Sequence, residues 1–317
     1  MESAKSKAPR GGVAAAVGAW VVLGVVAVFY FFVPGFGPMQ AQSPLVWLES
    51  AWNPATDFEH GFLVPVIMIG LIAWQWKGLR QAAGRGDWKG LPVALFGAAL
   101  FVLAHRTGQA RIAVGGLPFI LWGSALYLWG WGVARLALFP IFLLWLAIPL
   151  PHFQQATTQL QILSTKLAQI GCGLFGVETV VQGTQIGPPG GGWAPLEIDE
   201  GCGGIRSLMA LILISCVWAY LAKMPLWKKL ILCLSAVPLA IFGNMMRLTS
   251  IFVLSEYVNP KFASKTWHDW SGLLIFYPIS LAMLLLLHSV LERGLPKMRR
   301  LRVRQVSGYN PKAEGST

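Results

Sequence analysis

Long apolar runs alternate with short polar segments along most of the chain. Eight of these runs are long enough, or nearly so, to cross a hydrocarbon core of about 30 Å as a helix. They cover residues 13–33, 62–76, 91–105, 112–129, 134–150, 203–222, 229–254 and 272–291. The pattern predicts an all-α polytopic membrane protein with about eight transmembrane helices.

Composition supports this class, because 55% of the 317 residues are hydrophobic and only 12% are charged. Such a chain is too apolar for a soluble globular domain. We expect one membrane-embedded domain over residues 1–292, followed by a basic cytoplasmic tail at 293–317. The first run is about twice as long as the apolar part of a signal peptide, so it is interpreted as a membrane helix.

The longest segment outside the apolar runs is 151–201, between the fifth and sixth predicted spans. Its first part, 154–175, reads as a helix at the membrane interface, because one apolar stripe follows helical spacing. The stripe consists of Leu160, Leu163, Leu167 and Ile170. The stretches "ETVVQGTQI" and "WAPLEI" then flank "GPPGGG", which predicts a small β-hairpin at about 178–199.

Lysine and arginine are distributed unequally between the two predicted sides of the membrane. With eight spans, 18 of the 25 basic residues fall on the side that holds both termini. The other side holds the remaining 7, together with 9 of the 13 acidic residues. Cytoplasmic loops carry the excess of positive charge, so both termini are predicted to be cytoplasmic. The tail "KMRRLRVR" is then interpreted as an anchor to anionic membrane lipids, and no nucleic-acid partner is predicted.

Three polar side chains stand near the outer ends of the predicted spans. Cys202 lies where the sixth run begins, Arg247 lies inside the seventh, and His268 precedes the eighth. A rise of about 1.5 Å per residue carries the helix roughly 27 Å from Lys229 to Arg247, close to the outer surface. An ionisable residue inside a span is a functional candidate because its burial is costly. We therefore expect a thiol, a guanidinium and an imidazole at one depth.

These three groups suit acyl transfer from a peptide bond. The pKa of a thiol falls at a helix N-terminus or beside a cation, and Cys202 combines a predicted helix start with Arg206 one turn along. A histidine can protonate the leaving amine and an arginine can hold the oxyanion. The prediction is Cys202 as nucleophile with Arg247 and His268 as partners. For Arg247 the alternative is an anchor that extends its charge to the membrane surface.

Further residues are predicted to support this site. A cation near a helix N-terminus is disfavoured by the helix dipole, so Arg206 is expected to pair with Glu200 or Glu197. Asn244 lies one turn before the arginine of the seventh run and either bonds it or packs beside it. His60 opens the motif "HGFLVP" and is a candidate for the substrate side of the site.

The four cysteines lie too far apart in the sequence for a metal-binding motif, so neither a metal nor a cofactor is predicted. Cys172 is expected to be structural because no cation lies close to it in the sequence. A disulfide between Cys172 and Cys202 is the alternative in an oxidising outer compartment.

The order and spacing of these motifs resemble the exosortases and archaeosortases, polytopic membrane enzymes of prokaryotes. The resemblance rests on "HGFLVPVI" at 60–67, "FPIFLLWLAIPLP" at 139–151, "DEGCGGIRSL" at 199–208, "NMMR" at 244–247 and the segment around His268. The family's usual Cys-Ser-Gly is replaced here by Cys-Gly-Gly.

The resemblance implies a transpeptidase-like cysteine protease in the inner membrane of a prokaryote, with its active site on the outer side. Its partners would be exported proteins that carry PEP-CTERM-like C-terminal signals, made of a short motif, a membrane helix and a basic tail. It also implies a thioester on Cys202, with Arg247 and His268 completing the site, while the acyl acceptor stays open.

A second class of function is a non-enzymatic membrane component or a transporter in an exopolysaccharide export system. Arg247 and Glu200 would then line a substrate path. The sequence shows no internal repeat, and its polar groups gather at one face of the membrane instead of the midplane. Both features disfavour a transporter.

Overall fold

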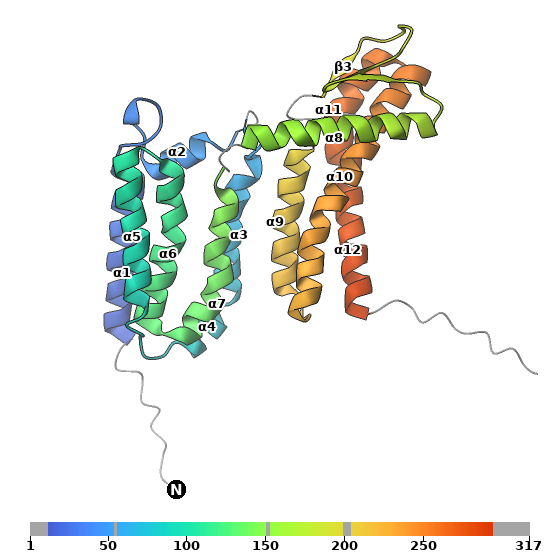
Figure 1. The fold of residues 1–317 in the computed structure, drawn as a ribbon. Helices are drawn as coiled ribbons and strands as arrows, with labels where there is room; N and C mark the ends of the chain where they lie inside the picture. Colours follow the sequence, from blue (N-terminus) through green and yellow to red (C-terminus); the bar gives the residue numbers. More distant parts are fainter. Residues whose placement is uncertain (1–11, 54–55, 150–152, 199–203, 294–317) are drawn as a thin grey trace, which may run out of the picture.

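The computed structural model describes residues 12–53, 56–149, 153–198 and 204–293 (Figure 1). Each of the eight predicted apolar runs corresponds to a helix. These helices are α1 (Gly12–Ala27, continued by η1, Val28–Phe32), α3 (Leu63–Trp74), α5 (Gly90–Thr107), α6 (Ala110–Trp129), α7 (Trp131–Phe142, continued by η5, Leu143–Ala147), α9 (Ile205–Leu221), α10 (Leu226–Tyr257) and α12 (Tyr277–Arg293). The shorter helices are η2 (Pro38–Gln40), α2 (Pro44–Ser50), η4 (Glu59–Phe62), α4 (Trp76–Ala82), η7 (Phe262–Trp267), α11 (His268–Ser271) and η8 (Gly272–Phe276).

The chain is a polytopic membrane protein, although the predicted number of eight full spans is not confirmed. In the described part of the chain, five helices are long and apolar enough to cross a membrane. A sixth span results if 59–74 and 76–82, which are bent by 60° to each other, count as one. The segments 131–147 and 205–221 are apolar but shorter. The helix at 205–221 lies between Gly204 and Pro225. Gly204 has a φ of +83°, and neither residue favours a longer helix.

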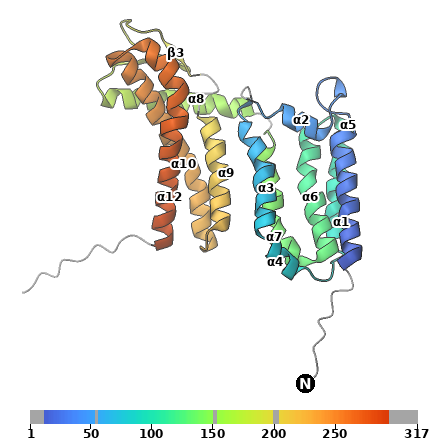
Figure 2. The ribbon, with the colours of Figure 1, turned by 180° about the vertical axis from the view of Figure 1, so that it is seen from behind.

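The long helices stand side by side in two groups (Figures 1 and 2). One group contains α1, α3, α5, α6 and α7, and the other contains α9, α10 and α12. Side chains of α9 join the groups, because the Tyr220 ring stacks on Phe139 with ring centroids 4.2 Å apart. The Tyr220 hydroxyl also donates a hydrogen bond to Gln75 Oε1 at 2.8 Å.

Helix α8 (Phe153–Leu174) lies across one end of the group formed by α9, α10 and α12, at a steep angle to these helices (Figure 1). Small and polar residues make up its buried face, namely Gln161, Ser164, Thr165, Ala168, Gly171 and Cys172. In the predicted apolar stripe, Leu163 is 40% and Ile170 62% exposed on the other face, whereas Leu160 and Leu167 are partly buried. A soluble protein would bury the apolar face, so this helix has the pattern of an interfacial one.

The segment after α8 forms three strands instead of the predicted hairpin. Strand β1 (Val180–Gln182) pairs antiparallel with β2 (Gln185–Gly187), which pairs antiparallel with β3 (Leu196–Glu197). The stretch read as one strand is split by a tight turn at Gly183, whose φ is +64°. Glycine adopts such a φ at little cost and favours two-residue hairpin turns. The Gly/Pro loop joins β2 to β3.

The two ends of the bundle differ in the way that the charge distribution predicts. The start of α1, the end of α4, the start of α10 and the end of α12 lie at the end opposite to α8 and the sheet (Figure 1). The short connections at that end contain Lys77, Arg80, Lys223, Lys228 and Lys229. The segments predicted to share the cytoplasmic side therefore share one end of the molecule.

Candidate active site

The site is built at the end of the bundle that α8 covers, where α9 begins. Gly204 precedes α9 with a left-handed backbone, and a Cβ added to it would lie 2.8 Å from Asn244 Cγ on α10. Asn244 is almost fully buried and donates from Nδ2 to Ser164 Oγ on α8 at 3.2 Å. Asn244 therefore packs against Gly204 and bonds a side chain of α8. This contact brings the starts of α9 and of the arginine motif together.

Arg247 lies one turn beyond Asn244 on the same helix. Its Nη2 donates to the backbone oxygen of His268 at 3.0 Å, so the predicted arginine and the predicted histidine segment meet. Its Nε is buried beside Gly272 and has no hydrogen-bond partner in the described part of the chain. A buried guanidinium N–H without a partner is costly, which indicates a group prepared to receive an acceptor.

His268 lies in α11, a single helical turn between the π-helical segments η7 and η8. Short π-helical insertions are rare and are frequent at functional sites. The imidazole Nδ1 lies 3.1 Å from Asp269 Oδ1, while the Trp267 indole donates to Ser250 Oγ on α10 at 2.8 Å. Neighbouring side chains therefore tie this turn to α10 and give the histidine a carboxylate partner.

Arg206 pairs with carboxylates that the sequence did not single out. Its Nε lies 2.5 Å from Asp57 Oδ1 and 3.7 Å from Glu59 Oε2. The expected pairing with Glu197 is not found among the described residues, because Glu197 belongs to the outer sheet. The other expected partner, Glu200, lies outside the described residues, as does Cys202.

Tyr277, at the start of α12, connects these groups. Its hydroxyl lies close enough to interact electrostatically with both Arg206 and Arg247, and with Asp57 and Glu59. The two guanidinium groups therefore belong to one charged cluster that contains residues from η4, α9, α10 and α12.

His60 is buried near this cluster but makes a structural contact. Its Nε2 lies 3.1 Å from the backbone oxygen of Leu146 in η5. The neighbouring Gly61 lies so close to the Trp52 ring that a Cβ would collide with it. The "HGF" motif thus packs the second predicted span against the end of the fifth.

Cys172 differs from a reactive cysteine in every respect that the structure describes. It is a free thiol, fully buried in the cluster formed by α8, α10 and the sheet. Burial raises the pKa of its thiol to about 11. At neutral pH such a group is protonated and inert.

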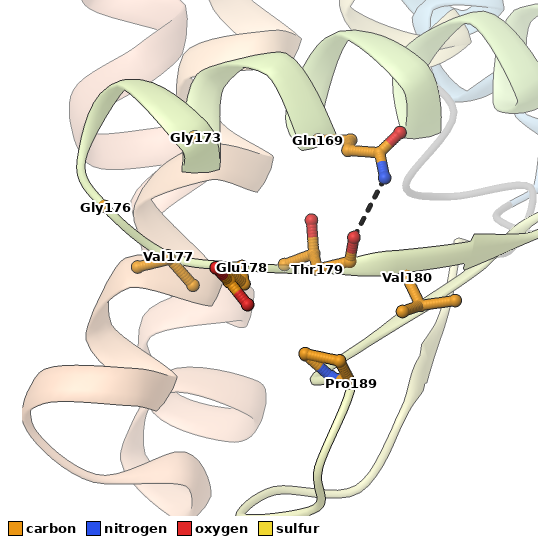
Figure 3. A pocket seen from close by; sticks show the side chains of 8 residues that line it. All are labelled: Gln169, Gly173, Gly176, Val177, Glu178, Thr179, Val180 and Pro189. Carbon is orange, nitrogen blue, oxygen red and sulfur yellow. Dashed lines mark hydrogen bonds between the residues drawn. The ribbon is translucent and has the colours of Figure 1, made fainter.

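An open cavity of about 550 Å³ lies at the end of α8 next to the sheet (Figure 3). It is lined by Gln169, Gly173, Gly176, Val177, Glu178, Thr179, Val180 and Pro189. None of the predicted site residues that the structure describes lines this cavity. In the described part of the chain, no three His, Cys, Asp or Glu side chains are grouped closely enough to hold a metal ion.

Sequence reasoning missed five residues around the candidate site, namely Asp57, Glu59, Asp269, Ser164 and Tyr277. Two signals were present: Asp57 and Glu59 directly precede the "HGFLVP" motif, and Asp269 adjoins His268. Ser164 and Tyr277 carried no such signal, because nothing in their local sequence distinguishes them from other hydroxyl residues in helices.

The fold and this cluster define a polytopic membrane protein with ionic groups gathered at one end of its bundle. The family model for the transmembrane exosortases (Exosortase_EpsH) matches residues 52–287, which is more than half of the chain. The chain therefore belongs to the transmembrane exosortase family, as its motifs had indicated. Among curated proteins and among solved structures, no significant match was found.

Proposed function

We propose that this exosortase is a cysteine-type transpeptidase that cleaves C-terminal sorting signals from exported proteins, with Cys202 as the nucleophile. The meeting of Gly204, Arg247 and the His268 turn at one end of the bundle supports this proposal most directly. Cys202 precedes Gly204 by two residues in the sequence.

The reaction begins when the Cys202 thiolate attacks the carbonyl carbon of the scissile peptide bond. A new C–S bond forms and the carbonyl oxygen takes up the negative charge. The C–N bond then breaks, the leaving amine receives a proton from His268, and a thioester remains on the enzyme. Water or an amine acceptor attacks this thioester and transfers its proton to the histidine, and the thiolate is released.

Arg247 is proposed to stabilise the tetrahedral oxyanion. Its Nε–H is buried without a partner in the described part of the chain, so an acceptor from the substrate would satisfy it. Donors placed in advance at an oxyanion commonly contribute about 3–4 kcal/mol to lowering the barrier.

His268 is proposed as the proton carrier. If its Nδ1–H is donated to Asp269, the basic lone pair lies on Nε2. A carboxylate partner also stabilises the imidazolium that forms when the ring accepts a proton. This is the arrangement required of a group that acts first as general acid toward the leaving amine and then as general base toward the acceptor.

The proposed location is the inner membrane of a prokaryote, with the active site on the outer side. The basic connections gather at the end of the bundle opposite to α8, which supports a cytoplasmic assignment for that end. The substrates would be exported proteins with PEP-CTERM-like signals. The acyl acceptor would decide between hydrolysis and transfer.

The test is a search for a covalent adduct on Cys202. Purified enzyme is mixed with an exported protein of the same genome that ends in a short motif, an apolar helix and an Arg-rich tail. Intact-mass measurement should show enzyme plus substrate fragment, released by hydroxylamine as expected for a thioester. Cys202→Ala and Cys202→Ser should both abolish the adduct and the processing.

Cys172→Ala is the matched control, because Cys172 is buried and its pKa is raised to about 11. This variant should form the adduct as the unmodified protein does. Processing by Cys202→Ala, or an adduct carried on Cys172, would refute the assignment. Normal secretion of polysaccharide without any processed protein would instead favour a component of an export system.

A further inference from the structure

The segment 52–62 connects the two groups of helices at the end where the site lies. Its side chains are attached to the end of α7, since the Trp52 indole donates to the backbone oxygen of Ala147 at 2.8 Å and His60 contacts that of Leu146. Both acceptors belong to η5. The described part of this segment is therefore anchored to the first group of helices.

The same segment contacts α9 through Phe58. The Phe58 ring is fully buried and packs with Ile205 and Met209, which lie on the first and second turns of α9. Leu160 of α8 completes this cluster. An apolar contact thus sets the distance between the segment and the start of α9.

Asp57 adds a directional contact to the apolar one. Its carboxylate is only 3% exposed and accepts a hydrogen bond from Arg206 Nε at 2.5 Å. Its backbone has a φ of +59°, in the left-handed region that few residues other than glycine adopt. Such conformations persist only where surrounding contacts stabilise them, and they are concentrated at functional sites.

The start of α9 needs this carboxylate for an electrostatic reason. The first turn of α9 has no acidic residue, and Gly204 offers no side chain to cap the free N–H groups. Arg206 places a positive charge at this positive end of the helix dipole, which is unfavourable. Asp57 and the more distant Glu59 bring negative charge to this helix end from another part of the chain.

We propose that Asp57 is a positioning residue that fixes the start of α9, the helix that follows Cys202 in the sequence, by its ion pair with Arg206. This inference rests on the proposed function, because it assigns Asp57 a role at the same site. It also means that Asp57 balances the charge of Arg206, the cation that follows Cys202 by one helical turn in the sequence.

The test separates positioning from general stability by two readouts on Asp57→Asn. Substrate processing should fall by about tenfold or more, since a misplacement of 1 Å can cost about 10²-fold. Alkylation of Cys202 at pH 7 by a membrane-impermeant maleimide should instead become about threefold faster, because Arg206 released from Asp57 lowers the thiol pKa. The alkylation is measured in a background with Cys172, Cys216 and Cys233 replaced by serine.

Glu49→Gln is the matched control, because it makes the same chemical change at an exposed carboxylate of α2 that forms no ion pair among the described residues. It should change both rates by less than about twofold. The exchanged pair Asp57→Arg with Arg206→Asp should restore part of the processing, and it keeps the test valid if Asp57→Asn fails to fold.

Two results would overturn the proposal: a folded Asp57→Asn protein with unchanged processing and alkylation, or a folded exchanged pair that restores neither. A failure of the proposed function is recognised separately, by processing in Cys202→Ala. In that case the alkylation of Cys202 still reports whether Asp57 controls the charge near this thiol.

Discussion

Arg247 illustrates at the scale of one residue why a charged group is found inside an apolar helix. It lies on α10, whose length allows it to reach the membrane surface beside α8. One of its N–H groups holds the backbone of the His268 turn and another is buried without a partner in the described part of the chain. An anchor that only extends its charge to water would have no need of these two contacts.

We predict that Arg247→Lys loses processing almost as completely as Arg247→Ala, by about 10²–10³-fold. An ammonium has no planar fork of donors and cannot bond the His268 carbonyl and an oxyanion from fixed positions. Rates of substrate cleavage measure the effect. Arg106→Lys is the control, because Arg106 is exposed at the end of α5. A Lys variant that retains nearly full activity would show that Arg247 contributes only charge.

Gly204 is a second position where the structure restricts which residue can be accommodated. A Cβ there meets Asn244, and the φ of +83° is itself strained for any other residue. We predict that Gly204→Ala destabilises the protein by roughly 2–3 kcal/mol, with strain supplying about 1–2 kcal/mol of this. Thermal unfolding in detergent gives the measurement.

Gly183→Ala is the control for the strain component. Gly183 has a φ of +64° but no atom near an added Cβ, so only the backbone cost applies. The unfolding temperature should therefore fall less than in Gly204→Ala. Equal losses would mean that the contact with Asn244 has no energetic weight.

At the scale of one element, α8 combines two functions on opposite faces. Its small residues allow close packing on α10, where Ala168 and Cys172 contact Leu248 and Phe252 in one buried cluster. On the other face, Leu163 and Ile170 are exposed. The helix therefore supports the site from one face and offers the other to the membrane interface.

We predict that spin labels at positions 163 and 170 are more accessible to oxygen than to a water-soluble nickel complex. Leu163→Cys and Ile170→Cys are labelled in a background without the native cysteines. A label at the exposed Lys166 should show the opposite preference, because this position lies beside the stripe. Equal access to the nickel complex at all three positions would rule out membrane contact of the stripe.

At the scale of the whole molecule, the bundle has one basic end and one end that carries α8, the sheet and the charged cluster (Figures 1 and 2). Helices α7 with η5 and α9 are short for a span, yet both contribute to the junction between the helix groups. These short helices can cross the membrane if the bilayer is locally thinner around them.

Reporter fusions test the topology that follows. Fusions after residues 80 and 224 should report the cytoplasm, and a fusion after residue 190 should report the exterior. The fusion after 224 is the most informative, because it follows the short helix α9. An exterior signal there would show that α9 does not cross the membrane, and reversed signals at 80 and 190 would refute the proposed orientation.

The sequence predicted much of the architecture because helix length and periodicity are encoded in short stretches of residues. All eight helices and the interfacial helix were found within a few residues, since the bilayer and helical geometry impose their lengths and periods directly on the sequence. The third strand was missed because Gly183, a residue that ends a strand, was read as part of one. The number of eight full spans is not confirmed, because α7 with η5 and α9 satisfy the pattern of a span without its full length.

The candidate site was predicted only in part, for a physical reason. The sequence by itself determined the membrane class, the order of the helices and the placement of Arg247 and the His268 turn at one end, since counting residues along a helix is enough to place a side chain in depth. Only the tertiary structure decided that Arg206 pairs with Asp57, which is 149 residues away. Depth restricts which groups can meet, but the choice among several carboxylates at one depth depends on how helices pack side by side.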